Sequence, residues 1–312
     1  MTSLDAAATR ALLDAGYVPG AVLGSGMEGT VVDLGRDRVA KAWHGRAVAG
    51  LRRLQTFHRA LRAGGMALAT PLVEDVLPVG DGSERGVTVE ARLGGRPLRA
   101  DTGEGEHHVG DPEIAAVLDV LRALAAVTPH PDLGVLPVLD GEPPFDARDP
   151  FAASLAGLVE RRLRASGHVL RRRVPDVDRV ARAVVDRLHA MGPGTTTVVH
   201  GDLVPGNILV TGDVASGVLD FGFLTTLGDP RFDAAVAASV HDMYGVRARH
   251  TEAAIDAALV SELGHDPEVL HLYRAAYALV TCTSYSASGS DGHFAWCARM
   301  LDRDDVRQAV GL

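Results

Sequence analysis

Residues 197–222 constrain the fold of this chain more than any other stretch, because short apolar runs alternate there with polar residues. The runs at 198–199, 208–210 and 218–219 are rich in β-branched residues, and each lies beside a histidine, an amide or a carboxylate. Runs of this length, separated by glycine- and proline-containing turns, are typical of buried strands. We therefore expect a loop followed by a hairpin, which brings two carboxylates and one amide to the same end.

The polar residues of this stretch suit phosphoryl transfer. Mg²⁺ prefers hard oxygen ligands and binds through one or two carboxylates plus substrate phosphates. Asp220 and Asn207 can supply two protein oxygens, which leaves Asp202 to accept the proton of a hydroxyl group. His200 is expected to brace the loop by hydrogen bonding, because Mg²⁺ disfavours imidazole.

Two motifs in this stretch resemble those of the aminoglycoside phosphotransferase family: H-G-D-L-x-x-x-N over residues 200–207 and D-F-G over residues 220–222. The resemblance continues through G-D-P at 228–230 and D-A-A at 233–235, and it weakens after about residue 240. This family is a branch of the protein-kinase-like fold. The resemblance therefore implies an enzyme that transfers phosphate to a hydroxyl group of a small molecule.

The same resemblance implies how the chain is divided. We expect an α+β, bilobal, protein-kinase-like fold. Residues 1–93 would form a small lobe with an antiparallel sheet, and residues 94–312 a large, mainly helical lobe. ATP or GTP would bind between the lobes with Mg²⁺, and the acceptor would bind in the large lobe.

A glycine-rich segment near the N-terminus, AVLGSGMEGTVV over residues 21–32, contains G-x-G-x-x-G-x-V. Such a segment could open a Rossmann unit, but a Rossmann loop leads into a helix and precedes an acidic residue by about 20 positions. Here the loop leads into a strand, so we expect the flap of a kinase-like protein, whose backbone N–H groups approach the phosphates closely. The expected phosphate contacts are Gly24, Ser25, Gly26 and Gly29.

Lys41 is the only lysine of the chain. It lies on an expected strand, where the phosphate-binding lysine of the family would lie, and its compact ammonium differs from the wide guanidinium of arginine. The family resemblance also predicts a glutamate on the next helix, 46–63, to orient the lysine, but none is present. Either a different acid serves or Lys41 is held by other means. The acids that lie outside this helix include Glu28, Glu74 and Asp75.

Strands expected at 72–79 and 86–91 complete the small sheet and lead into the glycine pair at 94–95. This segment is similar to the hinge where backbone groups of kinase-like proteins bind the adenine edge. The expected adenine contacts are Glu90, Ala91 and Arg92.

The rest of the chain is expected to be mainly helical, with helices at 112–127, 150–166 and 174–191 and throughout 231–312. The adjacent histidines at 107–108 lack a partner at metal-ligand spacing and indicate a surface loop. In related kinases the last helical region closes the acceptor pocket. The candidate acceptor contacts are Asp229, Asp233, Asp242, Asp291 and Trp296.

Only residues 223–227 separate D-F-G from G-D-P, whereas a protein kinase carries a longer activation segment that ends in A-P-E. Gly201 also replaces the arginine of the H-R-D motif. Both differences favour a small-molecule kinase over a protein Ser/Thr kinase. The expected acceptor is an antibiotic of the aminoglycoside, macrolide or nucleoside type. The alternatives are a metabolite such as choline, homoserine or a sugar, and a nucleotide-binding regulator without transfer activity, which the missing helix glutamate suggests.

Composition limits the partners. The formal net charge of −9 argues against nucleic-acid binding, because phosphate backbones favour clustered cations. No apolar run reaches membrane-spanning length, and the N-terminus lacks the pattern of a secretory signal. Cys282 and Cys297 form no disulfide framework or metal-ligand spacing. We therefore expect a cytoplasmic enzyme without a nucleic-acid or membrane partner.

Overall fold

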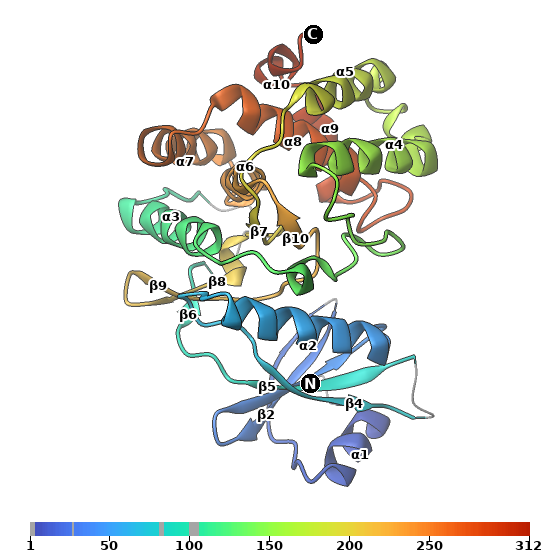
Figure 1. The fold of residues 1–312 in the computed structure, drawn as a ribbon, viewed down its shortest axis with the longest axis vertical. Helices are drawn as coiled ribbons and strands as arrows, with labels where there is room; N and C mark the ends of the chain where they lie inside the picture. The colour runs from blue at the N-terminus through green and yellow to red at the C-terminus, as the bar shows by residue number, and fades with distance from the viewer. Residues whose placement is uncertain (1–3, 27, 81–83, 100–105) are drawn as a thin grey trace.

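The computed structural model describes residues 4–26, 28–80, 84–99 and 106–312. Figure 1 shows a sheet with two helices at one end of the molecule and a mainly helical part at the other. This arrangement confirms the predicted α+β fold with an antiparallel N-terminal sheet.

Within the described residues, the N-terminal sheet has five antiparallel strands in the order β1-β2-β3-β5-β4. The strands are β1 (Val22–Ser25), β2 (Gly29–Gly35), β3 (Arg38–Trp43), β4 (Val73–Pro78) and β5 (Gly86–Ala91). Successive side chains of a strand point to opposite faces. Ala40 and Ala42 of β3 pack into the core beneath α1 (Ala6–Asp14), so Lys41 points to the other face, opposite Thr88.

Helix α2 (Val48–Ala63) joins the two ends of the molecule (Figure 1). It packs against β4 and against the short turn η1 (Pro131–Gly134). Its apolar stripe, which includes Leu51 and Phe57, is fully buried and belongs to the large core of the C-terminal part. A shift of α2 would therefore change its packing against both the N-terminal sheet and the helical part.

Two small sheets carry the polar stretch identified from the sequence. One has the order β6-β8-β9, with β6 (Arg96–Pro97), β8 (Ile208–Thr211) and β9 (Val214–Val218), and the other pairs β7 (Thr197–Val199) with β10 (Thr226–Gly228). The predicted hairpin is thus present as β8 and β9. The chain passes from the N-terminal sheet to β6 just after Gly94-Gly95, beside the proposed lobe boundary at residues 93 and 94.

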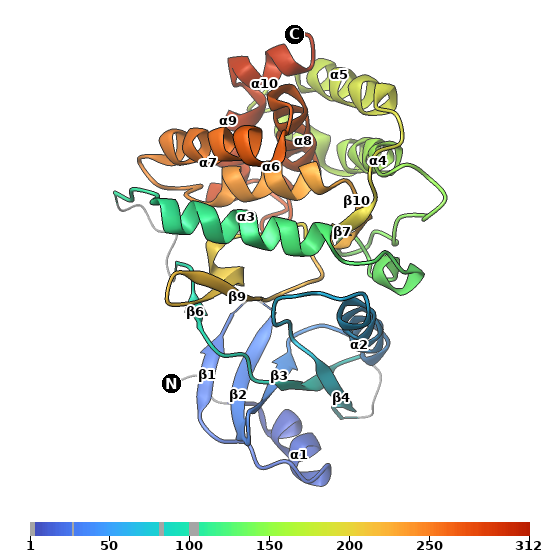
Figure 2. The ribbon, with the colours of Figure 1, turned by 60° about the vertical axis from the view of Figure 1, so that its left-hand side comes forward.

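Helices surround these sheets. Figure 2 shows α3 lying between the β6-β8-β9 sheet and helices α6 and α7, and α8 is buried among α4, α5, α6, α9 and α10. No helix in the described ranges is both long and apolar enough to cross a membrane. The helix bounds are α3 (Asp111–Ala125), α4 (Phe151–Leu170), α5 (Val177–Ala190), α6 (Pro230–Val240), α7 (Ala248–Leu263), α8 (Pro267–Thr281), α9 (Gly292–Leu301) and α10 (Asp304–Ala309).

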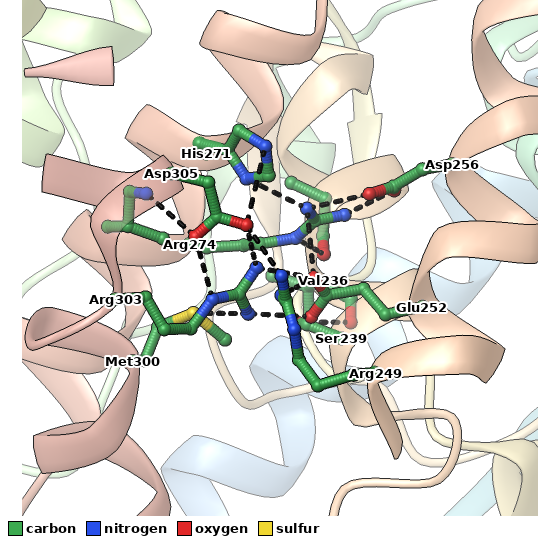
Figure 3. Close-up of polar contacts among 12 residues, drawn as sticks. Val236, Ser239, Arg249, Glu252, Asp256, His271, Arg274, Met300, Arg303 and Asp305 are labelled. Atoms are coloured by element: carbon green, nitrogen blue, oxygen red, sulfur yellow. Dashed lines mark hydrogen bonds and ion pairs between the residues drawn. The ribbon is translucent and has the colours of Figure 1, made fainter. Parts of the chain in front are cut away.

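A buried charge network holds the C-terminal helices together (Figure 3). Arg274 of α8 is fully buried; its guanidinium donates to Asp256, with one bond of 2.9 Å, and lies 3.5 Å from Glu252. Glu252 also pairs with Arg303 at 2.6 Å. Such a network offsets the cost of burying its charges only while every partner is present. Glu252 and Asp256 of α7 are therefore used inside the fold.

Candidate active site

The catalytic loop begins at His200, directly after β7. Its ring is fully buried, Nε2 donates to the backbone oxygen of Leu219 at 2.8 Å, and Nδ1 accepts the N–H of Asp202 at 3.1 Å. Burial lowers the pKa of His200 to about 4, so the ring is neutral and keeps this pair of roles. These contacts fit the bracing role predicted for His200.

Gly201 explains why this loop reads H-G-D. Its φ is +87°, in the region that favours glycine, and a Cβ there would lie 2.4 Å from the backbone oxygen of Phe223. Asp233 of α6 fixes the same turn, because its carboxylate accepts the N–H groups of His200 at 2.6 Å and Gly201 at 2.7 Å. Burial raises the pKa of Asp233 to about 7, while these two hydrogen bonds act in the opposite direction.

Asp202 and Asn207 are tied together at the other end of the loop. The amide nitrogen of Asn207 donates to the backbone oxygen of Asp202 at 2.8 Å, which leaves its amide oxygen as a ligand atom. Leu219 donates its N–H to the backbone oxygen of Asn207 at 2.8 Å, so Asp220 follows directly beside this residue. Burial raises the pKa of Asp202 to about 6, and the negative charges of Asp220 and Glu28 act in the same direction.

Asp220 has a φ of +54°, an uncommon backbone conformation for a residue with a side chain. Its carboxylate is half-exposed, and one oxygen lies 3.1 Å from Nζ of Lys41. A carboxylate and an amide oxygen on adjacent backbone segments are the hard donors that Mg²⁺ prefers. The residues therefore fit the predicted metal ion.

Lys41 lies beside this loop, on the face of the sheet that is turned away from α1. Its Nζ lies 2.7 Å from Glu28, 3.1 Å from Asp220 and 4.0 Å from the centre of the Trp43 ring. Burial acts to lower the pKa of Lys41, but the charges of Asp220 and Glu28 outweigh it and raise the value overall. The lone lysine is thus charged and directed at the loop.

The face of α2 near this lysine carries a histidine. His58 is almost fully buried, and Nδ1 bonds to the backbone oxygen of Pro71. Burial lowers the pKa of His58 to about 4, and the charge of Lys41 acts in the same direction. A neutral imidazole therefore occupies a helix face on which the family resemblance predicts a carboxylate.

The glycine-rich segment forms the antiparallel pair β1 and β2, with its tip partly outside the described residues at Met27. A Cβ built on Gly24 or Gly26 would meet no protein atom within 4 Å, so protein packing does not explain these glycines. Glycine also serves where a backbone must be approached closely by a ligand. Gly29 differs, because its Cβ would lie 2.3 Å from the backbone oxygen of Ala42.

Ser25 completes the predicted set of phosphate contacts. Its hydroxyl lies 3.1 Å from that of Thr30 on the facing strand. The side chain is therefore used across the hairpin, which leaves the backbone N–H as the group that a phosphate would meet.

Two of the predicted adenine contacts use their backbone N–H groups inside the protein. Ala91 donates its N–H to the backbone oxygen of Leu72 at 3.3 Å, and Arg92 donates to that of Asp37 at 2.7 Å. Glu90 lies in the ladder between β3 and β4. Along the chain, the next backbone N–H group after those of Ala91 and Arg92 is that of Leu93.

The side chain of Glu90 is also occupied. Its carboxyl group is buried and accepts the hydroxyl of Thr88 at 2.5 Å. Burial raises its pKa, so this acid is a poor counter-ion for a lysine.

Three of the five candidate acceptor contacts have carboxylates that are buried and have partners inside the protein. Asp233 supports the catalytic loop as described above. Asp229 caps α6 and accepts from Arg231 and, at 2.8 Å, from the hydroxyl of Tyr273. Asp242 pairs with Arg99 at 2.9 Å. The sequence shows the charge of these residues but not their burial.

The other two candidates lie at α9. Asp291 caps the helix through the N–H of Phe294 at 2.7 Å, and its second oxygen has no protein partner among the described residues. Trp296 is buried against Tyr277 and His293.

The sequence reasoning missed an aromatic pair near the catalytic loop. Tyr285 is 45% exposed and stacks on Phe223 with ring centres 6.4 Å apart. Burial raises the pKa of Tyr285, and the negative charge of Asp202 acts in the same direction. The backbone of Phe223 lies against Gly201 of the catalytic loop, which places this aromatic pair beside the loop. Phe223 directly follows D-F-G, and this position was the available signal.

A histidine pair predicted as a plain surface loop has tertiary contacts. Nε2 of His107 lies 2.8 Å from Glu113 of α3, and the same carboxylate oxygen is 3.5 Å from Nε2 of His241, just after α6. His108 is exposed as expected. These contacts attach the segment before α3 to two helices.

Comparisons with known proteins agree with this geometry. The family model described as "Phosphotransferase enzyme family", APH, matches residues 20–277. No curated protein sequence matches the chain.

Solved structures share the fold at low sequence identity. A thermostable mutant of aminoglycoside phosphotransferase APH(4)-Ia, in a ternary complex with ADP and hygromycin B, superimposes with a TM-score of 0.71 at 17% identity, covering 99% of this chain and 100% of that chain. The GDP complex of an aminoglycoside 2′-phosphotransferase-IIIa mutant gives 0.62 at 14% identity, with 93% and 92% covered. Macrolide 2′-phosphotransferase type I gives 0.59 at 19% identity, with 96% and 99% covered. The family match over most of its length shows that this chain belongs to the APH phosphotransferase enzyme family.

Proposed function

We propose that the protein transfers the γ-phosphate of ATP or GTP to a hydroxyl group of a small molecule, with an antibiotic as the first candidate acceptor. The observation that carries this proposal is the 3.1 Å approach of Nζ of Lys41 to Asp220. It joins the only ammonium side chain of the N-terminal sheet to the metal-binding end of the catalytic loop. Similar structures hold ADP with hygromycin B in one case and GDP in another.

In this proposal the nucleotide lies between the N-terminal sheet and the catalytic loop, with the lobe boundary at residues 93 and 94. The backbone at Gly24 and Gly26 covers the phosphates, and Lys41 neutralises part of their charge. Asn207 and Asp220 would hold Mg²⁺, which supplies positive charge to the phosphate oxygens when bound. Catalysis in this class depends on positioning and electrostatics.

Asp202 is the proposed general base. Its pKa of about 6 is close to neutral pH, so the carboxylate is mostly ionised there yet basic enough to accept a proton from the acceptor hydroxyl. The loop that carries it is fixed from both sides by His200 and Asp233. These contacts hold the base in one place, as proton transfer requires.

The acceptor class follows from what remains near Asp202. Asp229 and Asp233 are fully engaged inside the protein, whereas Asp242, which pairs with Arg99, and Asp291, which caps α9, each keep one oxygen without a protein partner in the described chain. The stacked pair Tyr285 and Phe223 offers an aromatic surface instead. We therefore include neutral, sugar-bearing acceptors, such as macrolides, as a second candidate class beside aminoglycosides. The proposed setting is the cytoplasm, where the nucleotide is available.

The test is a screen for nucleotide-dependent phosphate transfer. The purified protein is incubated with ATP or GTP, Mg²⁺ and a panel of aminoglycosides, macrolides, nucleosides and small metabolite alcohols, and products are read by mass spectrometry. A phosphorylated small molecule supports the proposal. Phosphate on a protein acceptor would instead indicate a protein kinase, and nucleotide binding without any product would indicate a regulator.

A further inference from the structure

The counter-ion of Lys41 is the part of this site that the sequence left open. Helix 46–63 contains no acid, and the structure places His58 on the helix face near the lysine. Of the acids on the same side of the sheet, Glu90 bonds to Thr88. The carboxylate within 3 Å of Nζ comes instead from Glu28, in the glycine-rich segment.

We propose that Glu28 is the positioning residue that holds Lys41, in the place of the missing helix glutamate. The role assumes the phosphate transfer proposed above. It assigns the glycine-rich segment two tasks: its backbone meets the phosphates, and its one carboxylate orients the ammonium that binds them.

Both oxygens of Glu28 face cations. Oε2 lies 2.7 Å from Nζ of Lys41, and Oε1 lies 3.6 Å from a guanidinium nitrogen of Arg46, just before α2. The guanidinium of Arg46 also lies 4.6 Å from the centre of the Trp43 ring, over which Lys41 stands. The carboxylate therefore links the glycine-rich segment to β3 and to the start of α2, as a helix glutamate would link β3 to the helix.

The backbone of Glu28 is fixed in the turn of the hairpin, directly before β2. Its carbonyl oxygen accepts the N–H of His44 at 2.9 Å, and the next residue, Gly29, pairs with Trp43. Lys41 lies two residues before Trp43 on β3. The side chain of Glu28 thus reaches the lysine from a backbone position that is hydrogen-bonded to the residue after β3.

The ammonium has three donors. Glu28 and Asp220 take two, which leaves one for a nucleotide phosphate. Without Glu28, Lys41 would pair more closely with Asp220, the proposed metal ligand. The loss should therefore disturb both nucleotide binding and the metal site.

The first test uses the fact that the chain has a single lysine. Protein labelled with ¹⁵N-lysine gives one side-chain resonance, and this signal reports Lys41 alone. E28Q should shift the resonance and speed hydrogen exchange of the ammonium, whereas E74Q, the same change in the Arg38–Glu74 ion pair of the same sheet, should leave both unchanged. An unchanged Lys41 signal in E28Q would overturn the proposal.

The second test is kinetic. E28Q should lower kcat/KM for the nucleotide by about 10- to 100-fold, because a displaced ammonium meets the phosphates poorly, and E28D should recover part of the loss. Tighter nucleotide binding or faster turnover in E28Q would show that Glu28 only competes with phosphate, and would contradict the role. A wild-type protein that transfers no phosphate would refute the proposed function, and the lysine resonance would still decide whether Glu28 holds Lys41.

Discussion

Replacing Gly201 by alanine tests whether the catalytic loop is built around a residue without a side chain. The φ of +87° costs a residue with a Cβ about 1–2 kcal/mol. The new Cβ would also lie 2.4 Å from the backbone oxygen of Phe223 and 2.7 Å from the backbone carbon of Leu224, and neither can move without the D-F-G segment. Overpacking of this kind typically costs about 1–3 kcal/mol. We therefore expect G201A to lose roughly 2–5 kcal/mol of unfolding free energy.

The matched control is G212A, in the turn between β8 and β9. Gly212 has a similar positive φ of +62°, but a Cβ there would meet no atom within 4 Å. G212A should therefore lose only about 1 kcal/mol, from the backbone conformation alone. Urea unfolding of both variants, together with turnover, measures the difference. If G201A were as stable and as active as G212A, the account of this turn would be wrong.

Three further changes separate ligand contacts from packing and charge. G26A should leave the unfolding midpoint near that of the wild type, since its Cβ meets no protein atom, but weaken nucleotide binding in calorimetry. E252Q should cost about 3 kcal/mol in urea unfolding without changing nucleotide affinity, because it leaves the buried Arg274 one partner short. Burial lowers the pKa of His293 to about 4, below its unfolded value of 6.5, so its contribution to stability is present above pH 6.5 and is lost as pH falls toward 4. Between pH 6.5 and 4 the unfolding free energy of H293N should therefore fall by roughly 3 kcal/mol less than that of the wild type. Unfolding curves recorded at several pH values measure this difference.

Local patterns in the sequence were enough to predict much of the fold. The apolar runs of residues 208–218 gave the hairpin β8–β9, and the helical spacing of 46–63 gave α2. Helix ends were less accurate, since the helical region expected throughout 231–312 is interrupted after Thr281 and again between α9 and α10.

The site shows the same division. The spacing of Asp202, Asn207 and Asp220 lies within one local unit and was readable directly. The partner of Lys41 was not, because the choice among acids depends on strand register and on which side chains are buried. The sequence also does not show that Asp233 is buried, and burial is what distinguishes an acid that fixes the loop from one that could contact an acceptor.

Replacement of Asp202 by asparagine tests the central claim most directly. The variant keeps the size of the side chain but cannot accept a proton from the acceptor hydroxyl. We expect turnover to fall by about 10²–10⁴-fold, while Mg²⁺-dependent nucleotide affinity in calorimetry stays near that of the wild type. Turnover close to the wild-type rate would contradict the account, because the proton would then have another acceptor.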